Sequence, residues 1–103
     1  MTKKVKQIKL RNIPFTESEI KRLIKDYLKI RGWYSFSILQ GIGAHKGIAD
    51  IYAIKGGRGI WIEVKSSRGK QSADQIEFQK NIEYHGGEYL LVKCLDDLID
   101  KGI

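Results

Sequence analysis

Two β-rich runs separated by a glycine pair constrain the fold of this chain more than any other feature. The runs are "IADIYAI" (residues 48–54) and "GIWIEVK" (residues 59–65), and Gly56 and Gly57 lie between them. A glycine pair suits a tight turn because both residues can adopt positive φ at little cost. The pattern therefore predicts a β-hairpin, and the position of the turn fixes its register.

The predicted register brings charged residues of the two strands together. The opposing pairs are Ile54 and Gly59, Tyr52 and Trp61, Asp50 and Glu63, and Ile48 and Lys65. Side chains alternate between the faces of a sheet. The residues on one face are then Tyr52, Trp61, Asp50, Glu63 and Lys65. The residues packing on the other face are Ile51, Ala49, Ile60, Ile62 and Val64.

A pair of opposing carboxylates needs a physical reason. Directly opposite Cβ atoms lie about 4.5–5.5 Å apart, where like charges are destabilising. Asp50 and Glu63 could share a proton, or they could share a divalent cation. Mg²⁺ is typically held by one or two carboxylates, waters and substrate phosphate oxygens. Alternatively, Glu63 and Lys65 form an ordinary solvated strand face on which the lysine neutralises the acids.

The remaining elements follow from periodicity and capping signals. Residues 16–32 predict a helix, in which Thr16 and Glu19 fit a capping box and Gly32 marks the end. Residues 33–40 alternate as a strand, and a glycine-rich loop follows. Ser72 and Gln75 fit a second capping box, for a helix that runs to about residue 85. Residues 88–94 predict a central strand, and residues 95–100 a short helix. The order is α-β-β-β-α-β-(α).

Charge and composition narrow the class of protein. The net charge is +7, and residues 1–49 carry eleven Lys/Arg and three Asp/Glu. This asymmetry favours a polyanionic partner such as nucleic acid. No apolar run approaches the roughly 20 residues that span a bilayer, and a single cysteine fits an intracellular location. Glycine spacing in "GIGAHKG" misses the known nucleotide-binding patterns, so no nucleotide cofactor is expected. We expect a basic arm over residues 1–12 and one domain over 13–103.

An acid in one strand, then E-x-K in the next, within this element order, resembles the PD-(D/E)xK nuclease superfamily. The segments "GIAD" (47–50), "WIEVKSSRGKQSADQ" (61–75) and "GGEYLLVK" (86–93) are most similar to its VRR-NUC family. Archaeal Holliday-junction resolvases are similar in outline. The resemblance runs from about Glu19 to Leu98 and departs at Ala49, where the superfamily label has proline. It implies a restriction-endonuclease-like α/β fold, with a mixed sheet flanked by helices.

The resemblance also implies an activity and a set of site residues. It implies a Mg²⁺- or Mn²⁺-dependent endonuclease acting on DNA, with Asp50, Glu63 and the Val64 backbone carbonyl as metal ligands. Lys65 would orient or deprotonate the attacking water, or stabilise the phosphate. Glu19 would reach the metal directly or through water, and Gln75 would lie near the site. Either residue could instead serve only as a helix cap.

Substrate and assembly are expectations from the same resemblance. Basic residues expected to bind DNA are Lys21, Arg22, Lys25, Lys46, Arg58, Arg68 and Lys70. Similar small nucleases imply a phage-like origin and a homodimer that cleaves branched DNA, such as a four-way junction. The aromatic residues Tyr34, Phe36, Tyr52 and Trp61 could form the dimer interface or the core. The alternatives to an enzyme are a non-catalytic nucleic-acid-binding module that keeps the fold, and a basic interaction protein whose E-x-K is incidental.

Overall fold

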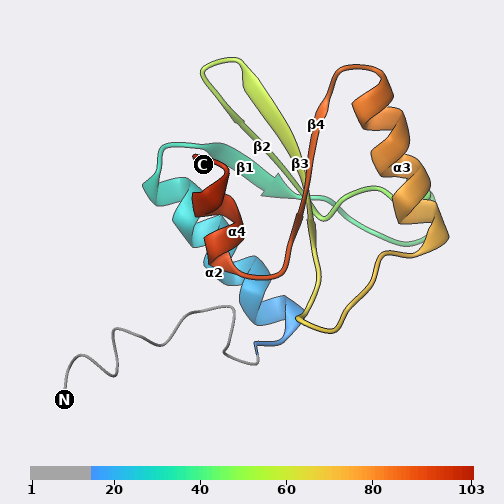
Figure 1. Cartoon of the computed structure of the whole chain (residues 1–103), viewed down its shortest axis with the longest axis horizontal. Helices are drawn as coiled ribbons and strands as arrows, with labels where there is room; N and C mark the ends of the chain where they lie inside the picture. The colour runs from blue at the N-terminus through green and yellow to red at the C-terminus, as the bar shows by residue number, and fades with distance from the viewer. Residues whose placement is uncertain (1–14) are drawn as a thin grey trace.

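The computed structural model describes residues 15–103, which form one mixed sheet with helices on both faces (Figure 1). The elements are α2 (Glu17–Ile30), β1 (Tyr34–Ser37), β2 (Ile51–Lys55), β3 (Arg58–Val64), α3 (Ala73–Tyr84), β4 (Glu88–Val92) and α4 (Leu95–Asp100). The strand order is β1-β2-β3-β4. The first three strands are antiparallel, and β4 runs parallel to β3. The basic arm expected over residues 1–12 lies outside the described residues.

The hairpin forms as predicted around the glycine pair. Gly56 and Gly57 have φ of 56° and 84°, which a side chain would disfavour. Tyr52 lies opposite Trp61, in the predicted register. This register continues to the pair Ile51 and Ile62, where β2 begins.

Beyond that pair the two strands no longer follow the predicted ladder. The Asp50 amide donates to the Ile62 carbonyl at 3.0 Å, one residue short of Glu63. The predicted pairing of Ile48 with Lys65 is wrong, because β2 begins only at Ile51 and the Val64 amide donates to the Asp50 side chain instead of to a backbone carbonyl. The Lys65 amide donates on the other side, to the Val92 carbonyl at 3.0 Å. β3 thus stays paired with β4 after β2 has ended.

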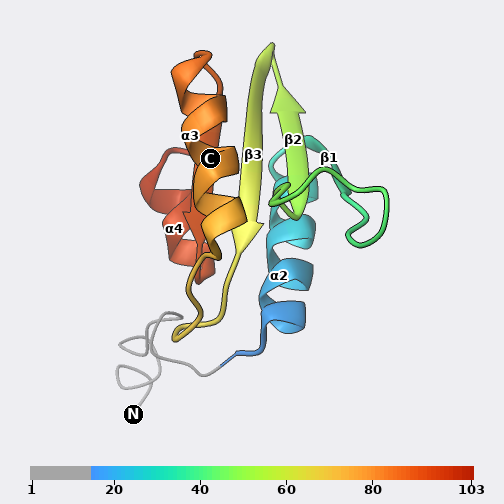
Figure 2. The ribbon, with the colours of Figure 1, turned by 90° about the vertical axis from the view of Figure 1, so that its right-hand side faces the viewer.

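Two apolar clusters lie on opposite faces of the sheet. Helices α2 and α4 cover one face, and α3 covers part of the other (Figure 2). Predicted core residues Ile51, Ile60, Ile62 and Val64 pack in the first cluster, with Ile24 of α2 among others. Ala49 was expected on this face, but it packs in the second cluster with Phe78 and Tyr89. The alternation fails there because the chain leaves the ladder at Asp50.

β4 is an edge strand, so the predicted central position is wrong. Its sequence is apolar because helices cover both of its faces, although a neighbouring strand pairs with only one of its edges. Tyr89 packs in the α3 cluster, whereas Leu90 and Val92 belong to the cluster with α2 and α4. A strand covered on both faces is apolar throughout wherever it lies in the sheet.

Both predicted capping boxes are present. The Thr16 hydroxyl accepts from the Glu19 amide at the start of α2, and the Ser72 hydroxyl accepts from the Gln75 amide at the start of α3. Each box satisfies backbone donors that have no partner within the helix. Within residues 15–103, no helix is long and apolar enough to cross a membrane.

Candidate active site

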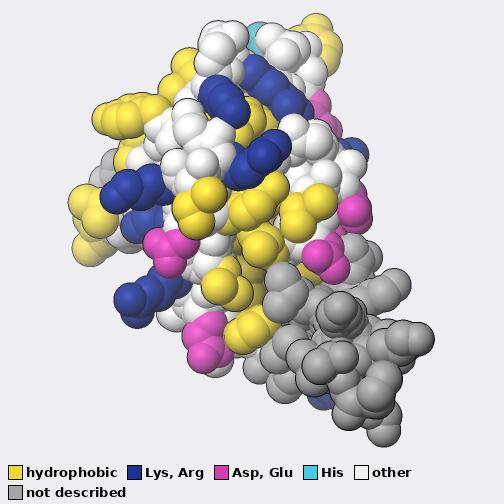
Figure 3. Space-filling view, turned by 90° about the vertical axis from the view of Figure 1, so that its left-hand side faces the viewer, with side chains coloured by type: hydrophobic (Ala, Val, Ile, Leu, Met, Phe, Trp, Pro, Cys, Tyr) yellow, Lys and Arg dark blue, Asp and Glu magenta, His cyan; other side chains and the backbone are white. Residues whose placement is uncertain are grey.

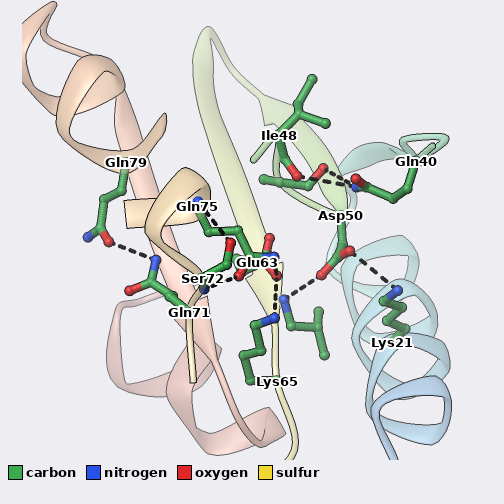
Figure 4. Close-up of polar contacts among 12 residues, drawn as sticks. Lys21, Gln40, Ile48, Asp50, Glu63, Lys65, Gln71, Ser72, Gln75 and Gln79 are labelled. Carbon is green, nitrogen blue, oxygen red and sulfur yellow. Dashed lines mark hydrogen bonds and ion pairs between the residues drawn. The ribbon is translucent and has the colours of Figure 1, made fainter. Parts of the chain in front are cut away.

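Asp50 and Glu63 meet where β2 begins and β3 nears its end (Figure 4). Both are acidic and both are buried, with 9% and 1% of their surface exposed. Burial disfavours the charged form of a carboxyl group unless it has charged or hydrogen-bonding partners. The structure brings together the two acids that the hairpin register predicts to lie close, because the Asp50 carboxylate acts directly on the Glu63 carboxyl group.

Asp50 is held between a strand and a helix. Its Oδ2 accepts a hydrogen bond from the Val64 amide at 2.8 Å. This bond replaces the backbone ladder that ends at Ile51. Its Oδ1 forms an ion pair with the Lys21 Nζ at 3.3 Å. Helix α2 thus supplies a cation to an acid that precedes β2.

Glu63 has partners on one oxygen only. Its Oε2 accepts from the Gln75 Nε2 at 2.9 Å and lies 3.4 Å from the Lys65 Nζ. Its Oε1 is buried and has no hydrogen-bond partner. Leaving a buried polar atom unpaired costs about 1–3 kcal/mol. An atom of this kind at a site suggests that something else binds there.

The protonation of Glu63 reflects this environment. The pKa of Glu63 is raised to about 7, chiefly by burial and next by the adjacent Asp50 carboxylate, while Lys65 acts in the opposite direction. Two carboxylates this close do not both ionise readily without added positive charge. The site therefore favours a cation or a proton between its two acids.

Gln75 combines the two roles that its sequence position left open. Its Oε1 accepts from the Ser72 amide at 2.8 Å, which completes the capping box. Its Nε2 donates to Glu63, so the same amide group caps α3 and orients the buried acid. The capping bond fixes which end of the amide faces Glu63.

Glu19 is not brought to the two acids. Its carboxylate accepts from the Thr16 amide at 2.9 Å and from the Thr16 hydroxyl at 3.1 Å, and it is exposed. These bonds lower the pKa of Glu19. Glu17, half-buried at the start of α2, lies one turn before Lys21 and so shares its helix face. The spacing between Glu17 and Lys21 could have been read from the sequence, but nothing there showed which face met Asp50.

The donor set suits a hard divalent cation. Among residues 15–103, no cluster of three or more Asp, Glu, His or Cys could hold a metal ion. Zinc usually takes three or four such ligands, whereas Mg²⁺ uses one or two carboxylates with water and phosphate oxygens. The two carboxylates of Asp50 and Glu63 fit the pattern for Mg²⁺, and the unpaired Oε1 of Glu63 is free to be a ligand. In the structure, the Lys21 and Lys65 ammonium groups supply the positive charge at these carboxylates.

Most of the predicted DNA-binding residues are exposed, and three of them lie in loops adjoining β2 and β3. Lys46 is in the loop before Asp50, and Arg68 and Lys70 are in the loop after Lys65. Arg58 is different, because it opens β3 at the turn, five residues from Glu63 along an extended strand. Its guanidinium binds Glu88 through two bonds of 3.0 and 2.8 Å. The expectation that Arg58 lies near the site is therefore wrong.

Arg22 and Lys25 line a groove between α2 and β1 that starts beside Lys21. One hollow, of about 430 Å³, is lined by Ser18, Lys21, Arg22, Lys25, Asp26 and Ser37. A second, of about 330 Å³, is lined by Lys25, Asp26, Lys29, Trp33, Tyr34 and Ser35. The two hollows share Lys25 and Asp26, so they are contiguous. On the α2 side of the molecule, Lys and Arg side chains are more prominent than Asp and Glu (Figure 3).

The sheet order, flanking helices and buried acid pair define a restriction-endonuclease-like α/β domain. A solved structure of a VRR_NUC domain protein matches it with a TM-score of 0.72 at 19% sequence identity. The match covers 86% of this chain and 86% of that chain. The chain thus has the fold of a VRR-NUC domain, which confirms the predicted fold. No family model and no curated protein matches the sequence.

Proposed function

We propose that the protein is a divalent-metal-dependent endodeoxyribonuclease that hydrolyses phosphodiester bonds in branched or structured DNA, four-way junctions included. One observation carries the proposal. Two buried acids, Asp50 and Glu63, face each other with an unpaired Glu63 oxygen and two flanking ammonium groups. A cation bound by both acids would satisfy that oxygen, whereas leaving a buried acceptor unpaired weakens the fold.

Asp50, Glu63 and the Val64 backbone carbonyl would hold Mg²⁺ or Mn²⁺. Such an ion polarises a phosphoryl oxygen and lowers the pKa of a bound water. The bond from the Val64 amide to Asp50 fixes this stretch of β3 relative to the acid, so the ligands are held before any ion arrives. Preorganised ligands of this kind do not have to be reordered during the reaction.

The two lysines and Gln75 would complete the site. Lys65, whose side chain is only 14% exposed, would orient or deprotonate the attacking water, or stabilise charge on the phosphate. Lys21 would act on the phosphate from the α2 side once an ion takes over the neutralisation of Asp50. Gln75 would hold Glu63 in the ligand orientation through its Nε2 bond.

The acid from α2 would be Glu17 rather than Glu19. Glu17 shares a helix face with Lys21, which touches Asp50, whereas the Glu19 carboxylate is occupied at the capping box. Glu17 would reach the metal directly or through water. Glu17→Gln is then expected to impair cleavage, and Glu19→Gln, which keeps an oxygen for the cap, provides the matched control.

DNA would approach along the basic groove between α2 and β1. Arg22 and Lys25 line the groove, and the exposed residues Lys46, Arg68 and Lys70 lie in the loops before Asp50 and after Lys65. Lysine and arginine bind phosphates with little regard for sequence, and such binding weakens steeply with salt. This arrangement suits an enzyme that selects the structure of its substrate rather than its sequence.

A homodimer would give two such sites for a branched substrate. The half of the sheet not covered by α3 presents Tyr34 and Phe36, which are 70% and 46% exposed. Phe36 contacts Tyr52, and Tyr52 contacts Trp61, so aromatic rings cross the sheet from the open half to the covered half. Sedimentation equilibrium tests this assembly, and a solution mass of one chain would exclude it.

Cleavage of labelled DNA tests the proposed activity. Four-way junctions, flaps and linear duplexes are incubated with wild type in Mg²⁺ and in EDTA. Asp50→Asn and Lys65→Met are expected to lose cleavage while retaining the folded state by circular dichroism. Metal-dependent cleavage that survives both substitutions would refute the assigned site. Wild type that binds these DNAs but cleaves none of them would instead favour a non-catalytic binding module.

A further inference from the structure

The loop between β1 and β2, which ends at Asp50, exposes two large apolar side chains. Leu39 is 88% exposed and Ile42 is 110% exposed, so almost none of their surface is covered. In Figure 2 this loop projects away from the sheet. Burying one such side chain is worth about 1.5–3 kcal/mol, and here that free energy is available to a partner.

The base of the loop is fastened to the site. The Ile38 amide donates to the Asp50 carbonyl at 2.7 Å, which closes the loop at the first acid. The Gln40 Nε2 then donates across the base to the Ile48 and Ala49 carbonyls, at 3.2 and 3.3 Å (Figure 4). Hydrogen bonds to the backbone carbonyls of residues 48–50 therefore hold the two ends of the loop together.

The returning limb of the loop packs on α3. The His45 ring meets the Phe78 ring edge-on, with centroids 5.7 Å apart. Gly47 has φ of +72°, and a Cβ placed there would lie 2.1 Å from the Asp74 carbonyl oxygen. Only glycine allows this close approach, which sets the loop against the helix that carries Gln75.

A tight turn presents the apolar tip. The Ala44 amide donates to the Gly41 carbonyl at 3.0 Å, so Ile42 occupies the first corner of the turn. Ile42 is two residues beyond Gln40, whose side chain binds the Ile48 and Ala49 carbonyls, so the chain places Ile42 at most about 7 Å from Gln40. That limit is about two base steps of 3.4 Å along one strand. The tip is therefore tethered within a few base steps of the residues that precede Asp50.

We propose that Leu39 and Ile42 form an apolar wedge that enters DNA where base stacking is interrupted. This inference rests on the proposed function and names the feature of the substrate that the site selects. Leucine and isoleucine are among the side chains that proteins insert between base steps. Unstacking an intact step costs a few kcal/mol, and the cost is least where pairing is already disturbed. The wedge therefore favours branch points over a continuous duplex.

Charge favours nucleic acid over a second protein as the occupant of this loop. Lys46 is exposed on the same loop, and Lys21 of α2 contacts the acid where the loop ends. Asp50 is the only acid between residues 38 and 50, and it is buried. A polyanion can therefore approach the tip without meeting an exposed negative charge on the loop.

Binding in EDTA tests the wedge without requiring catalysis. Fluorescence anisotropy is measured for a four-way junction and for a linear duplex of the same arm sequence, at one fixed salt concentration. Wild type is compared with Ile42→Ser and Leu39→Ser. Ile30→Ser is the matched control, because Ile30 is 83% exposed at the end of α2, away from the loop. All three substituted side chains are exposed, so folding is expected to be unaffected, which thermal melts verify.

The expected result is a change in preference rather than a general loss of affinity. Ile42→Ser should weaken junction binding by about tenfold, the equivalent of one poorly replaced apolar contact, and leave the duplex unchanged. Leu39→Ser should act in the same direction and Ile30→Ser should not. A 2-aminopurine base at the branch point should brighten with wild type and much less with Ile42→Ser.

Several outcomes would overturn the wedge. These are an unchanged junction-to-duplex ratio in Ile42→Ser, an equal loss on both DNAs, and no binding of either DNA by wild type. A shift of Ile42→Ser from dimer to monomer with an unchanged ratio would assign the tip to a second copy instead. Binding and cleavage are read separately. If Ile42→Ser loses the preference for junctions but wild type does not cleave DNA, the proposed enzyme is rejected and the wedge is retained. If wild type cleaves DNA but Ile42→Ser has an unchanged junction-to-duplex binding ratio, the wedge is rejected and the enzyme is retained.

Discussion

The two longest helices begin with the same capping motif, but the two motifs perform different tasks. At α2, the Glu19 carboxylate accepts hydrogen bonds from the Thr16 amide and hydroxyl and remains exposed. At α3, Gln75 caps Ser72 with its oxygen and holds the buried Glu63 with its nitrogen. A carboxylate has no donor for a second acid at neutral pH, whereas an amide has both a donor and an acceptor. A capping residue can therefore also hold a site residue only if the side-chain atom not used in the cap can hydrogen-bond that residue.

The largest expected effect is the loss of cleavage on substitution of Glu63, the acid that Gln75 holds. Glu63→Gln removes a proposed metal ligand, so metal-dependent cleavage should fall by about a thousandfold or more, as expected for loss of several kcal/mol of electrostatic stabilisation. The corresponding change at the other box, Glu19→Gln, should leave cleavage near wild type. Single-turnover cleavage of a labelled junction measures both variants. Equal losses would show that the two boxes do not differ in function.

Gly47→Ala should disturb the α3 box through its backbone. The new Cβ would collide with the Asp74 carbonyl, and φ of +72° disfavours any side chain, so the free energy of unfolding should fall by about 3 kcal/mol. Gly43→Ala is the control, because φ is +89° and no atom lies within 4 Å of the added Cβ. It should lose only about 1–2 kcal/mol. Urea denaturation separates the two, and equal losses would mean that the contact with α3 has no role.

Removing each capping side chain compares the boxes directly. Gln75→Ala and Glu19→Ala should each cost about 1 kcal/mol of stability, the usual value of a helix cap. Only Gln75→Ala should also reduce cleavage, by about 10–100-fold, because an outer partner of a metal ligand is lost. Thermal melts and cleavage rates test this pair. The Mg²⁺ dependence of cleavage should shift to higher concentration in Gln75→Ala, which a merely structural cap would not cause.

Two further effects concern pH, and their signs differ between the two glutamates. The pKa of Glu63 is raised to about 7, so the metal-free fold binds this proton more tightly than the unfolded chain. Its contribution to stability is fully present below about pH 4.5 and is lost as pH rises through 7, with an amplitude of roughly 2–3 kcal/mol. Urea denaturation in EDTA at pH 5 and pH 8 should show this fall in wild type relative to Glu63→Gln.

Glu19 should show the opposite sign. Its pKa is lowered by the bonds from Thr16, so its contribution is present at neutral pH and is lost as pH falls through that lowered pKa. Comparison of wild type with Glu19→Gln below pH 5 measures it. A stability that rose on protonation of Glu19 would contradict the bonds seen at this cap.

The sequence determined most of the local structure. A glycine pair between β-rich runs determined the hairpin and its register as far as Ile51 and Ile62. Thr16 with Glu19, and Ser72 with Gln75, determined where both helices begin. These features depend on residues a few positions apart, so local geometry is sufficient to predict them. The nearness of Asp50 and Glu63 followed from the same register.

Only the tertiary structure decided how these elements serve a site. β4 continues to pair with β3 after β2 ends, so the chain leaves the ladder at Asp50 and its carboxylate binds the Val64 amide instead. The packing of α2 on the sheet directs Lys21, rather than Glu19, toward that acid. These outcomes depend on which faces of distant elements meet. Hydrophobic periodicity indicates that a helix will pack, but it does not specify which polar residue will lie at the edge of the contact.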